Sequence, residues 1–355
     1  MIEPFVYNGL PARVVFGWGT LDKLPEEVDR LGIKRALVLS TPPQEESARD
    51  LAKRLGPSAA GVFPGATMHT PVEVTEKAMT VVRELGVDGT VAVGGGSTTG
   101  LGKAIALRTG LPQLVVPTTY AGSEMTPIIG ESRDGLKSTQ TTLDVLPETV
   151  IYDVDLTMTL PASLSGTSGV NAVAHAVEAL YARERNPIVN MMSQECIAAM
   201  ARALPRIAKD PSDRAARGDA LYGAWLGGAV LALVGMSLHH KLCHTIGGSF
   251  DLPHAETHTI VLAHAAAYNA PAAPDAMARI AQALQADDAA RGLFDLAKAT
   301  GAKMALRDLG MPEEGIDKAA DLAVQKPYWN PRPIEREPVR ALIARAWAGE
   351  PPQVS

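Results

Sequence analysis

Histidines are the residues whose types and spacing most clearly indicate chemistry in this chain of 355 residues. Seven of the eight histidines lie between residues 175 and 264. Two pairs of residues are spaced four apart within expected helices, so that each pair shares one side of its helix: Asn171 and His175, and His240 and His244. His254 and His258 have the same spacing. Convergent imidazoles can hold a metal ion. They can also do acid–base work without a metal, because imidazole titrates near neutral pH. From the spacing alone, both interpretations stay open.

A glycine-rich loop is the second candidate site. In VAVGGGSTTGLGKAIAL (residues 91–107) a strand is expected to end, residues 94–96 are glycines, and a helix is expected to begin near Thr98. Glycines let the backbone approach a ligand closely, and the amides at a helix N-terminus favour a phosphate. The loop matches neither common fingerprint, because Thr99 replaces the third glycine of one and Ser97 the first glycine of the other. It therefore predicts a phosphate site, with a tight turn without ligand as the alternative.

A second polar loop, VPTTYAGSEMTP, also follows an expected strand and covers residues 116–127. Thr118, Thr119 and Ser123 offer hydroxyls for a ribose or phosphate, although an ordinary turn has the same composition. The second expected strand ends in residues 40–42 (Ser-Thr-Pro), without the carboxylate that often holds the ribose 2′-hydroxyl of NAD. We therefore expect weak discrimination between NADH and NADPH.

The elements that must position these residues fall into two domains. Residues 1–158 alternate helical patterns with short β-rich runs at 35–40, 61–63, 89–93, 113–117 and 149–153. This alternation predicts an α/β domain with a parallel, Rossmann-like sheet and helices on both faces. Both polar loops would then lie at the carboxyl ends of strands, where open α/β sheets bind ligands. Residues 159–355 predict an all-helical domain with segments at 161–183, 187–208, 212–236, 239–248, 258–269, 275–286, 288–309, 312–323 and 335–347.

Composition narrows the class of protein. An apolar content of 46% can bury a sizeable core, and a net charge of −6 argues against nucleic-acid binding. Only Cys196 and Cys243 occur, and the chain starts without a signal-peptide pattern, so a reduced, cytoplasmic protein is expected. The uncharged stretch 220–238 is long enough to cross a bilayer, but we interpret it as a buried helix of the helical domain, not as a membrane span.

Four separated motifs resemble the iron-containing alcohol dehydrogenase superfamily: the GGGS loop, PTTYAGSE, SGVNAVAHAVEALYA and HHKLCHTIGGSFDLPH. In its metal-dependent members, an Asp, a His four residues later and two His fourteen residues apart bind the ion. His175, His240 and His254 match three of these positions, but Asn171 replaces the Asp. Gly100 likewise replaces the Asp of the usual GGGSxxD pattern. An amide does not compensate the charge of a divalent cation as a carboxylate does.

Both departures resemble the maleylacetate reductase branch of that superfamily. The resemblance implies an α/β nucleotide domain followed by an all-helical domain, assembled as a homodimer. It implies reduction of the carbon–carbon double bond of maleylacetate to 3-oxoadipate, in the degradation of aromatic compounds, with NADH or NADPH and without a metal. Two alternatives are a metal-dependent alcohol dehydrogenase acting on a small carbonyl compound and a nucleotide-binding protein without catalysis.

The resemblance also assigns site residues. Hydride addition to an alkene conjugated with a ketone places negative charge on the ketone oxygen, and the enolate then needs a proton. We expect His240, His244 and His254 to polarise the ketone and protonate the enolate, with His175 supporting them. Residues expected to contact the dicarboxylate substrate are Asn171, His239, Lys241 and Arg332. Residues expected to contact the coenzyme are His69, Gly95, Gly96, Ser97, Thr118, Thr119, Ser123 and Lys137.

Overall fold

The computed structural model describes residues 4–133, 136–325 and 328–354. The chain divides into two compact units, with the division between Leu160 and Pro161. Residues 9–160 form an α/β unit, and the residues from Pro161 onward form a helical unit to which residues 4–8 also belong. The sequence placed the domain boundary between residues 158 and 159.

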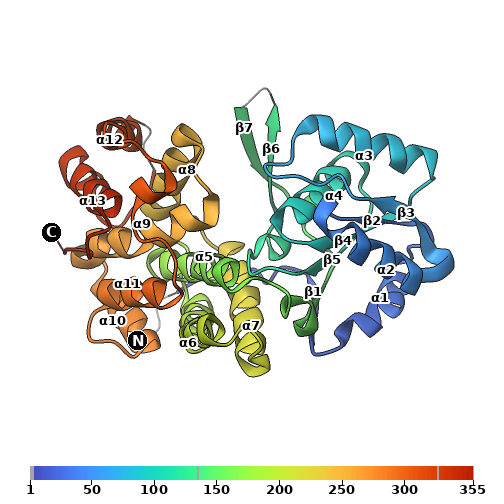
Figure 1. The fold of residues 1–355 in the computed structure, drawn as a ribbon, viewed down its shortest axis with the longest axis horizontal. Coiled ribbons are helices and arrows are strands. Elements are labelled where there is room, and N and C mark those ends of the chain that lie inside the picture. Colours follow the sequence, from blue (N-terminus) through green and yellow to red (C-terminus); the bar gives the residue numbers. More distant parts are fainter. Residues whose placement is uncertain (1–3, 134–135, 326–327, 355) are drawn as a thin grey trace. The chain divides into compact units, whose positions relative to one another are not determined.

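A six-stranded sheet forms the centre of the α/β unit, in the order β1-β8-β5-β4-β2-β3 (Figure 1). All neighbouring strands run parallel, which confirms the predicted sheet. The strands are β1 (Arg13–Gly17), β2 (Ala36–Leu39), β3 (Ala59–Phe63), β4 (Gly89–Gly94), β5 (Gln113–Pro117) and β8 (Thr149–Asp153). The helices are α1 (Leu24–Arg30), α2 (Glu45–Leu55), α3 (Val72–Glu84) and α4 (Gly96–Thr109).

Alternate residues of the strands pack on opposite faces of this sheet. In β4, Val91 and Val93 belong to the core that contains α1 and α2, whereas Ala92 belongs to the core that contains α3 and α4. Strands covered on both faces become almost continuously apolar, which made them recognisable in the sequence. Gly94 at the end of β4 pairs with Pro117 at the end of β5, so both polar loops leave the sheet at neighbouring points.

Three strands were not predicted. β1 is an edge strand, and its partly exposed residues break the apolar run that marks the inner strands. β6 (Ile128–Arg133) and β7 (Leu136–Thr141) form a separate antiparallel pair rich in polar residues. Strands with so few apolar residues leave little apolar periodicity in the sequence.

The helical unit contains no strand among its described residues, as predicted. Its centre is α5, in which every residue from Ser165 to Tyr181 is buried. The helices are α5 (Ala162–Tyr181), α6 (Pro187–Lys209), α7 (Arg214–Leu231), α8 (Leu238–Phe250), α9 (His254–Asn269), α10 (Pro274–Leu284), α11 (Ala289–Ala299), α12 (Gly315–Gln325) and α13 (Arg336–Ala348). The predicted helix 288–309 is instead α11 and a short 3-10 turn at 306–309, separated by Gly301 in the left-handed region at φ 75°.

The uncharged stretch 220–238 does not form one helix, because α7 ends at Leu231 and α8 begins at Leu238. Within residues 4–133, 136–325 and 328–354, no helix combines the length and apolar character needed to span a bilayer. Most apolar residues that the stretch contributes to α7 are buried, so the predicted burial is confirmed for that part, but the prediction of one continuous helix is wrong.

Candidate active site

The glycine loop connects β4 to α4 in the α/β unit. Gly95 is the N-cap of α4, and the helix begins at Gly96, two residues earlier than expected. Gly95 has no side chain to cap the helix, so the first amides of α4 depend on water or a ligand for acceptors. A Cβ atom at Gly95 would lie only 3.0 Å from Thr119 Cγ2, so the two polar loops approach each other closely. The exposed start of α4 is therefore suited to an anionic group.

The second loop carries its hydroxyls next to this helix start. The Thr118 amide donates to the carbonyl of Gly94 at 3.0 Å, and the Gln44 side chain donates to Thr118 Oγ1 at 3.0 Å. Ser123 Oγ is buried and has no hydrogen-bond partner among the described residues. Thr118, Thr119 and Ser123 thus lie in the same part of the unit as the glycine loop.

Lys103, which sequence reasoning missed, fixes the second loop to α4. Its side chain is 1% exposed, and its Nζ donates to the carbonyl oxygens of Ser123 at 2.6 Å, Thr126 at 2.7 Å and Ile128 at 2.8 Å. Burial lowers the pKa of Lys103 to about 7, while the surrounding carbonyl oxygens are acceptors suited to an ammonium group. The only indication in the sequence was a lysine inside an otherwise apolar helical segment.

Two other predicted coenzyme residues have different surroundings. His69 is exposed and adopts a left-handed conformation at φ 65° just before α3. Its neighbour Thr70 packs its Oγ1 against Gly100 of α4, in the position where a Cβ at residue 100 would lie. Lys137 is in β7, but its side chain lies outside the described residues.

In the helical unit, four buried histidines from three helices come together, and we call them the histidine cluster. They are His175 of α5, His239 and His240 of α8, and His258 of α9. The centre of the His240 ring lies 5.2 Å from that of the His175 ring and 4.9 Å from that of the His258 ring. His239 Nε2 and His258 Nδ1 are 3.1 Å apart, within hydrogen-bonding distance. Of these residues, the sequence analysis did not assign His258 a role.

His244 and His254 adjoin the cluster but are exposed. Their rings stack with centres 6.1 Å apart, and the centre of His254 lies 4.1 Å from that of His258. The predicted catalytic histidines therefore divide into a buried pair, His175 and His240, and an exposed pair.

Glu178 is a further residue that the sequence analysis missed. It is 0% exposed, and its Oε2 accepts a hydrogen bond of 2.7 Å from His240 Nδ1. Burial alone would raise its pKa, but the bond from His240 and the nearby imidazoles bring the pKa of Glu178 down to about 2. The sequence did contain an indication of this role, because Glu178 is the only acidic or basic residue, apart from His175, in the otherwise uncharged α5.

The histidine cluster has the properties of a metal site. One nitrogen from each of His239, His240 and His258 lies within 4.8 Å of the others. Burial lowers the pKa of His239 to about 3 and that of His258 well below its usual value, so both are neutral, the form that binds metals. Buried side-chain atoms without a hydrogen-bond partner in the described part of the chain include Asn171 Oδ1, His175 Nδ1, His240 Nε2 and His258 Nε2. Neutral imidazoles with open nitrogens fit a divalent transition metal.

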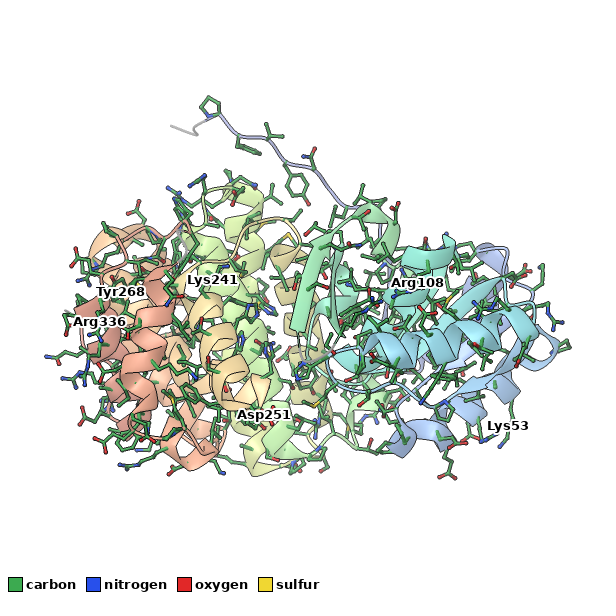
Figure 2. All side chains as sticks on the ribbon, turned by 90° about the horizontal axis from the view of Figure 1, so that it is seen from above. Lys53, Arg108, Lys241, Asp251, Tyr268 and Arg336 are labelled. Atoms are coloured by element: carbon green, nitrogen blue, oxygen red, sulfur yellow. The ribbon has the colours of Figure 1, made fainter. Side chains whose placement is uncertain are left out.

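The two cationic residues expected to bind substrate have structural partners. Arg332 Nη1 donates to the carbonyl of Tyr268 at 3.0 Å, and its guanidinium lies 4.3 Å from the centre of the Tyr268 ring. Lys241 is exposed on α8, with Nζ 5.6 Å from the centre of the Tyr328 ring. Lys241 and Tyr268 can both be followed in Figure 2. Lys241 is thus the more accessible of the two.

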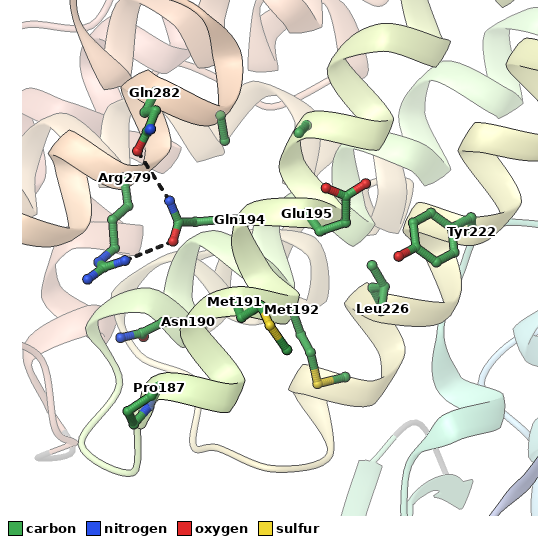
Figure 3. A pocket seen from close by; sticks show the side chains of 12 residues that line it. Pro187, Asn190, Met191, Met192, Gln194, Glu195, Tyr222, Leu226, Arg279 and Gln282 are labelled. Carbon is green, nitrogen blue, oxygen red and sulfur yellow. Dashed lines mark hydrogen bonds between the residues drawn. The ribbon is translucent and has the colours of Figure 1, made fainter. Parts of the chain in front are cut away.

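A hollow of about 850 Å³ lies elsewhere in the helical unit, among residues of α6, α7 and α10 (Figure 3). Gln194 accepts a hydrogen bond from Arg279 at 2.8 Å on its wall, and Met191 and Tyr222 also line it. None of the predicted site residues is among the described residues that line this hollow. The chemistry is therefore concentrated at the histidine cluster and not in this hollow.

Comparison with known protein families agrees with this arrangement. Residues 11–154 match the model of iron-containing alcohol dehydrogenases, and residues 165–347 match the C-terminal model of the iron-containing alcohol dehydrogenase family. The chain belongs to the iron-containing alcohol dehydrogenase family, as its motifs suggested.

Within this family, the chain is similar to maleylacetate reductases along its whole length. The maleylacetate reductase of Rhizobium sp. (strain MTP-10005) is 56% identical, over 99% of this chain and 100% of the relative. The maleylacetate reductase of Sphingobium indicum is 57% identical, over 98% of this chain and 99% of the relative. The crystal structure of maleylacetate reductase from Agrobacterium tumefaciens superposes with a TM-score of 0.96 at 56% identity, over 99% of this chain and 100% of that one. These relatives identify an oxidoreductase.

The prediction that no metal takes part is wrong. The family is an iron-containing one, and His239, His240 and His258 can together hold an ion. The prediction weighed only the missing carboxylate at position 171, whereas the structure places the carboxylate of Glu178 directly behind His240. Because an ionised carboxylate only accepts, the proton of this bond lies on His240 Nδ1, which leaves Nε2 as the ring atom whose lone pair can coordinate an ion. A lone pair suits a cation and not the oxyanion that His240 was expected to stabilise.

Proposed function

We propose that the chain is a maleylacetate reductase that uses NADH or NADPH to reduce the carbon–carbon double bond of maleylacetate, giving 3-oxoadipate in the degradation of aromatic compounds. The observation that carries the proposal is identity of 56% to 57% with maleylacetate reductases over nearly the full length of both chains. The buried histidine cluster supports it, because reduction of a conjugated ketone requires a group that attracts the charge of the enolate oxygen.

The two polar loops of the α/β unit would bind the coenzyme, which supplies the hydride when bound. The amides of Gly95, Gly96 and Ser97 at the start of α4 would receive the pyrophosphate. Hydroxyls of Thr118 and Thr119 would contact its sugar or phosphate oxygens, with Ser123 at the same loop. His69 and Lys137 would contribute to the adenosine side.

His239, His240 and His258 would hold the metal ion that the family name implies. When bound, such an ion supplies a Lewis acid for the ketone oxygen of the substrate. The remaining members of the site, Asn171 and His175, carry buried atoms without a protein partner in the described part of the chain and would contact the substrate.

The exposed histidines would handle the proton. His244 and His254 can exchange protons with solvent, unlike the buried cluster, and imidazole titrates close to neutral pH. After hydride has added to the carbon farther from the ketone, one of them would protonate the α-carbon of the enolate, the carbon bonded to the ketone carbon, which restores the ketone. Lys241 and Arg332 would help to bind the substrate carboxylates, with Lys241 better placed because it is exposed.

The test is coenzyme oxidation by the purified full-length protein, followed at 340 nm with maleylacetate and with simple aldehydes as separate substrates. We expect rapid oxidation of NADH with maleylacetate, much slower oxidation with aldehydes, and 3-oxoadipate as the product. A protein that oxidises NADH with aldehydes but not with maleylacetate is a general carbonyl reductase, which contradicts the proposal. Sedimentation of the same sample tests the homodimer that we also propose.

A further inference from the structure

Glu178 lies beneath the histidine cluster and is entirely removed from solvent. A buried carboxylate is costly unless hydrogen bonds and charge partners compensate for lost hydration. Glu178 accepts from four donors, all within residues 237–240: the Ser237 amide at 3.0 Å, Ser237 Oγ at 2.9 Å, the His239 amide at 2.8 Å and His240 Nδ1 at 2.7 Å. Among the described residues, its donors thus all come from the N-cap and the first residues of α8.

The contact between Glu178 and the His239 amide stabilises the start of a helix. α8 begins at Leu238, and its N-cap Ser237 makes no side-chain capping bond of its own to the helix. The carboxylate of Glu178 accepts the His239 amide in its place and puts a negative charge at the positive end of the helix. Because His239 and His240 are the second and third residues of α8, this contact sets their height relative to α5.

The contact between Glu178 and His240 Nδ1 selects the tautomer of the His240 ring. A proton on His240 Nδ1 is required by the bond to the carboxylate, so Nε2, which has no hydrogen-bond partner among the described residues, is the ring atom left to coordinate a cation. The stacking of His240 on His175 holds the plane of the ring from the other side, with 27° between the two planes. His240 therefore has one orientation and one tautomer.

We propose that Glu178 is a positioning residue, which makes the histidine cluster a cation site by fixing the tautomer of His240 and the start of α8. It does not touch the substrate. The proposal deepens the proposed function, on which its catalytic consequence rests, but its consequence for cation binding does not depend on the substrate. Carboxylates that orient metal-binding histidines in this way typically change metal affinity or activity by about 10- to 100-fold.

The chain offers a matched control. Glu184 also accepts a backbone amide from the segment before α8, that of Gly235 at 3.1 Å, but it is exposed and this donor is not a histidine. Glu184→Gln therefore removes a carboxylate from the same connection without changing the bond to His240. Glu178→Gln keeps the size of the side chain and removes its charge, and Glu178→Asp keeps the charge on a shorter side chain.

The experiment measures Zn²⁺ affinity of the full-length proteins against a competing chelator, the ring ¹⁵N shifts of histidine, and NADH kinetics with maleylacetate. We expect Glu178→Gln to bind Zn²⁺ about 10- to 100-fold more weakly, with a similar loss of kcat. The His240 spectrum, assigned by its absence in His240→Gln, should lose its protonated Nδ1. The Kd for NADH should not change, and Glu184→Gln should match the wild type in every measurement.

The proposal is overturned if folded Glu178→Gln retains Zn²⁺ affinity and the Nδ1-protonated form of His240. If Glu178→Gln does not fold, Glu178→Asp decides: an unchanged affinity and tautomer contradict the proposal, and an intermediate loss of affinity supports it. A wild-type protein whose Zn²⁺ affinity depends on Glu178 but which does not reduce maleylacetate contradicts the proposed function alone.

Discussion

In each of the two candidate sites a buried ionisable side chain holds the backbone in place, but Lys103 donates hydrogen bonds and Glu178 accepts them. Under the polar loops, Lys103 donates to the backbone carbonyls of a loop. Under the histidine cluster, Glu178 accepts backbone amides and one imidazole at the start of a helix. The loop site presents mainly backbone groups, whereas the cluster presents side chains.

This difference predicts how substitutions at each site should affect binding and catalysis. A site made of backbone amides keeps most of its donors when one side chain is changed, so substitutions there should weaken binding gradually. A site made of a few imidazoles loses a chemical group with each substitution, so the reaction itself should slow. Four measurements would sharpen or break this contrast, and they follow from the largest expected effect to the smallest.

Removal of metal should have the largest effect. After prolonged treatment with a strong chelator, we expect kcat to fall by about 1000-fold, because a Lewis acid supplies several kcal/mol of charge stabilisation. Addition of Fe²⁺ or Zn²⁺ should restore the rate, and the Kd for NADH should be constant throughout. If protein that lacks metal by elemental analysis is fully active, the prediction of a catalytic metal is wrong, and the imidazoles of the cluster act alone.

His244→Ala should lower kcat by at least about 100-fold, the usual contribution of a general acid, while the protein still binds NADH. Steady-state kinetics with maleylacetate and fluorescence titration of NADH would separate the two effects. His254→Ala is the comparison, because it shows which exposed imidazole delivers the proton. If both variants turn over at nearly the normal rate, neither imidazole is the acid.

Lys103→Met should raise the Kd for NADH by about tenfold, which corresponds to the loss of one to two hydrogen bonds from the loop, while kcat changes little. Lys77→Met is its control, because Lys77 is exposed on α3. Calorimetric titration of NADH checks both variants. An effect of Lys103→Met on kcat with unchanged NADH affinity would contradict the assignment of this loop to the coenzyme.

The smallest effect should be the preference between coenzymes. Because β2 is followed by Ser40, Thr41 and Pro42 and not by a carboxylate, we expect kcat/KM values for NADH and NADPH within about tenfold of each other. Parallel assays with the two coenzymes measure the ratio. A hundredfold preference in either direction would show that other residues distinguish the 2′-hydroxyl of NADH from the 2′-phosphate of NADPH.

The pattern of apolar residues was sufficient to predict most of the fold. The inner strands β2, β4, β5 and β8 are buried on both faces, so their apolar runs were visible in the sequence. The edge strand β1 and the β6–β7 pair lack such runs and were missed. The helix α9 was predicted to begin at residue 258 and begins one turn earlier, at His254.

The candidate site was harder to predict, because its geometry depends on contacts between distant helices. Spacing of four placed His240 near His244 and His254 near His258, but it did not show that His239 and His258 meet at 3.1 Å. Burial of Glu178 and Lys103 follows from the packing of α5 and α4, which no local pattern records. The clue to Glu178 was a single carboxylate in the apolar helix α5, and the clue to Lys103 was a lysine among the apolar residues in the middle of α4.

The contact between Gly100 and Thr70 has an evolutionary consequence. Thr70 Oγ1 occupies the space into which any side chain at position 100 would project. A sequence that acquires a larger residue at 100 must therefore rotate or shorten its neighbour at 70, and the two positions should covary among relatives. An aspartate introduced at 100 alone would be tolerated less well than the same aspartate combined with a glycine at 70.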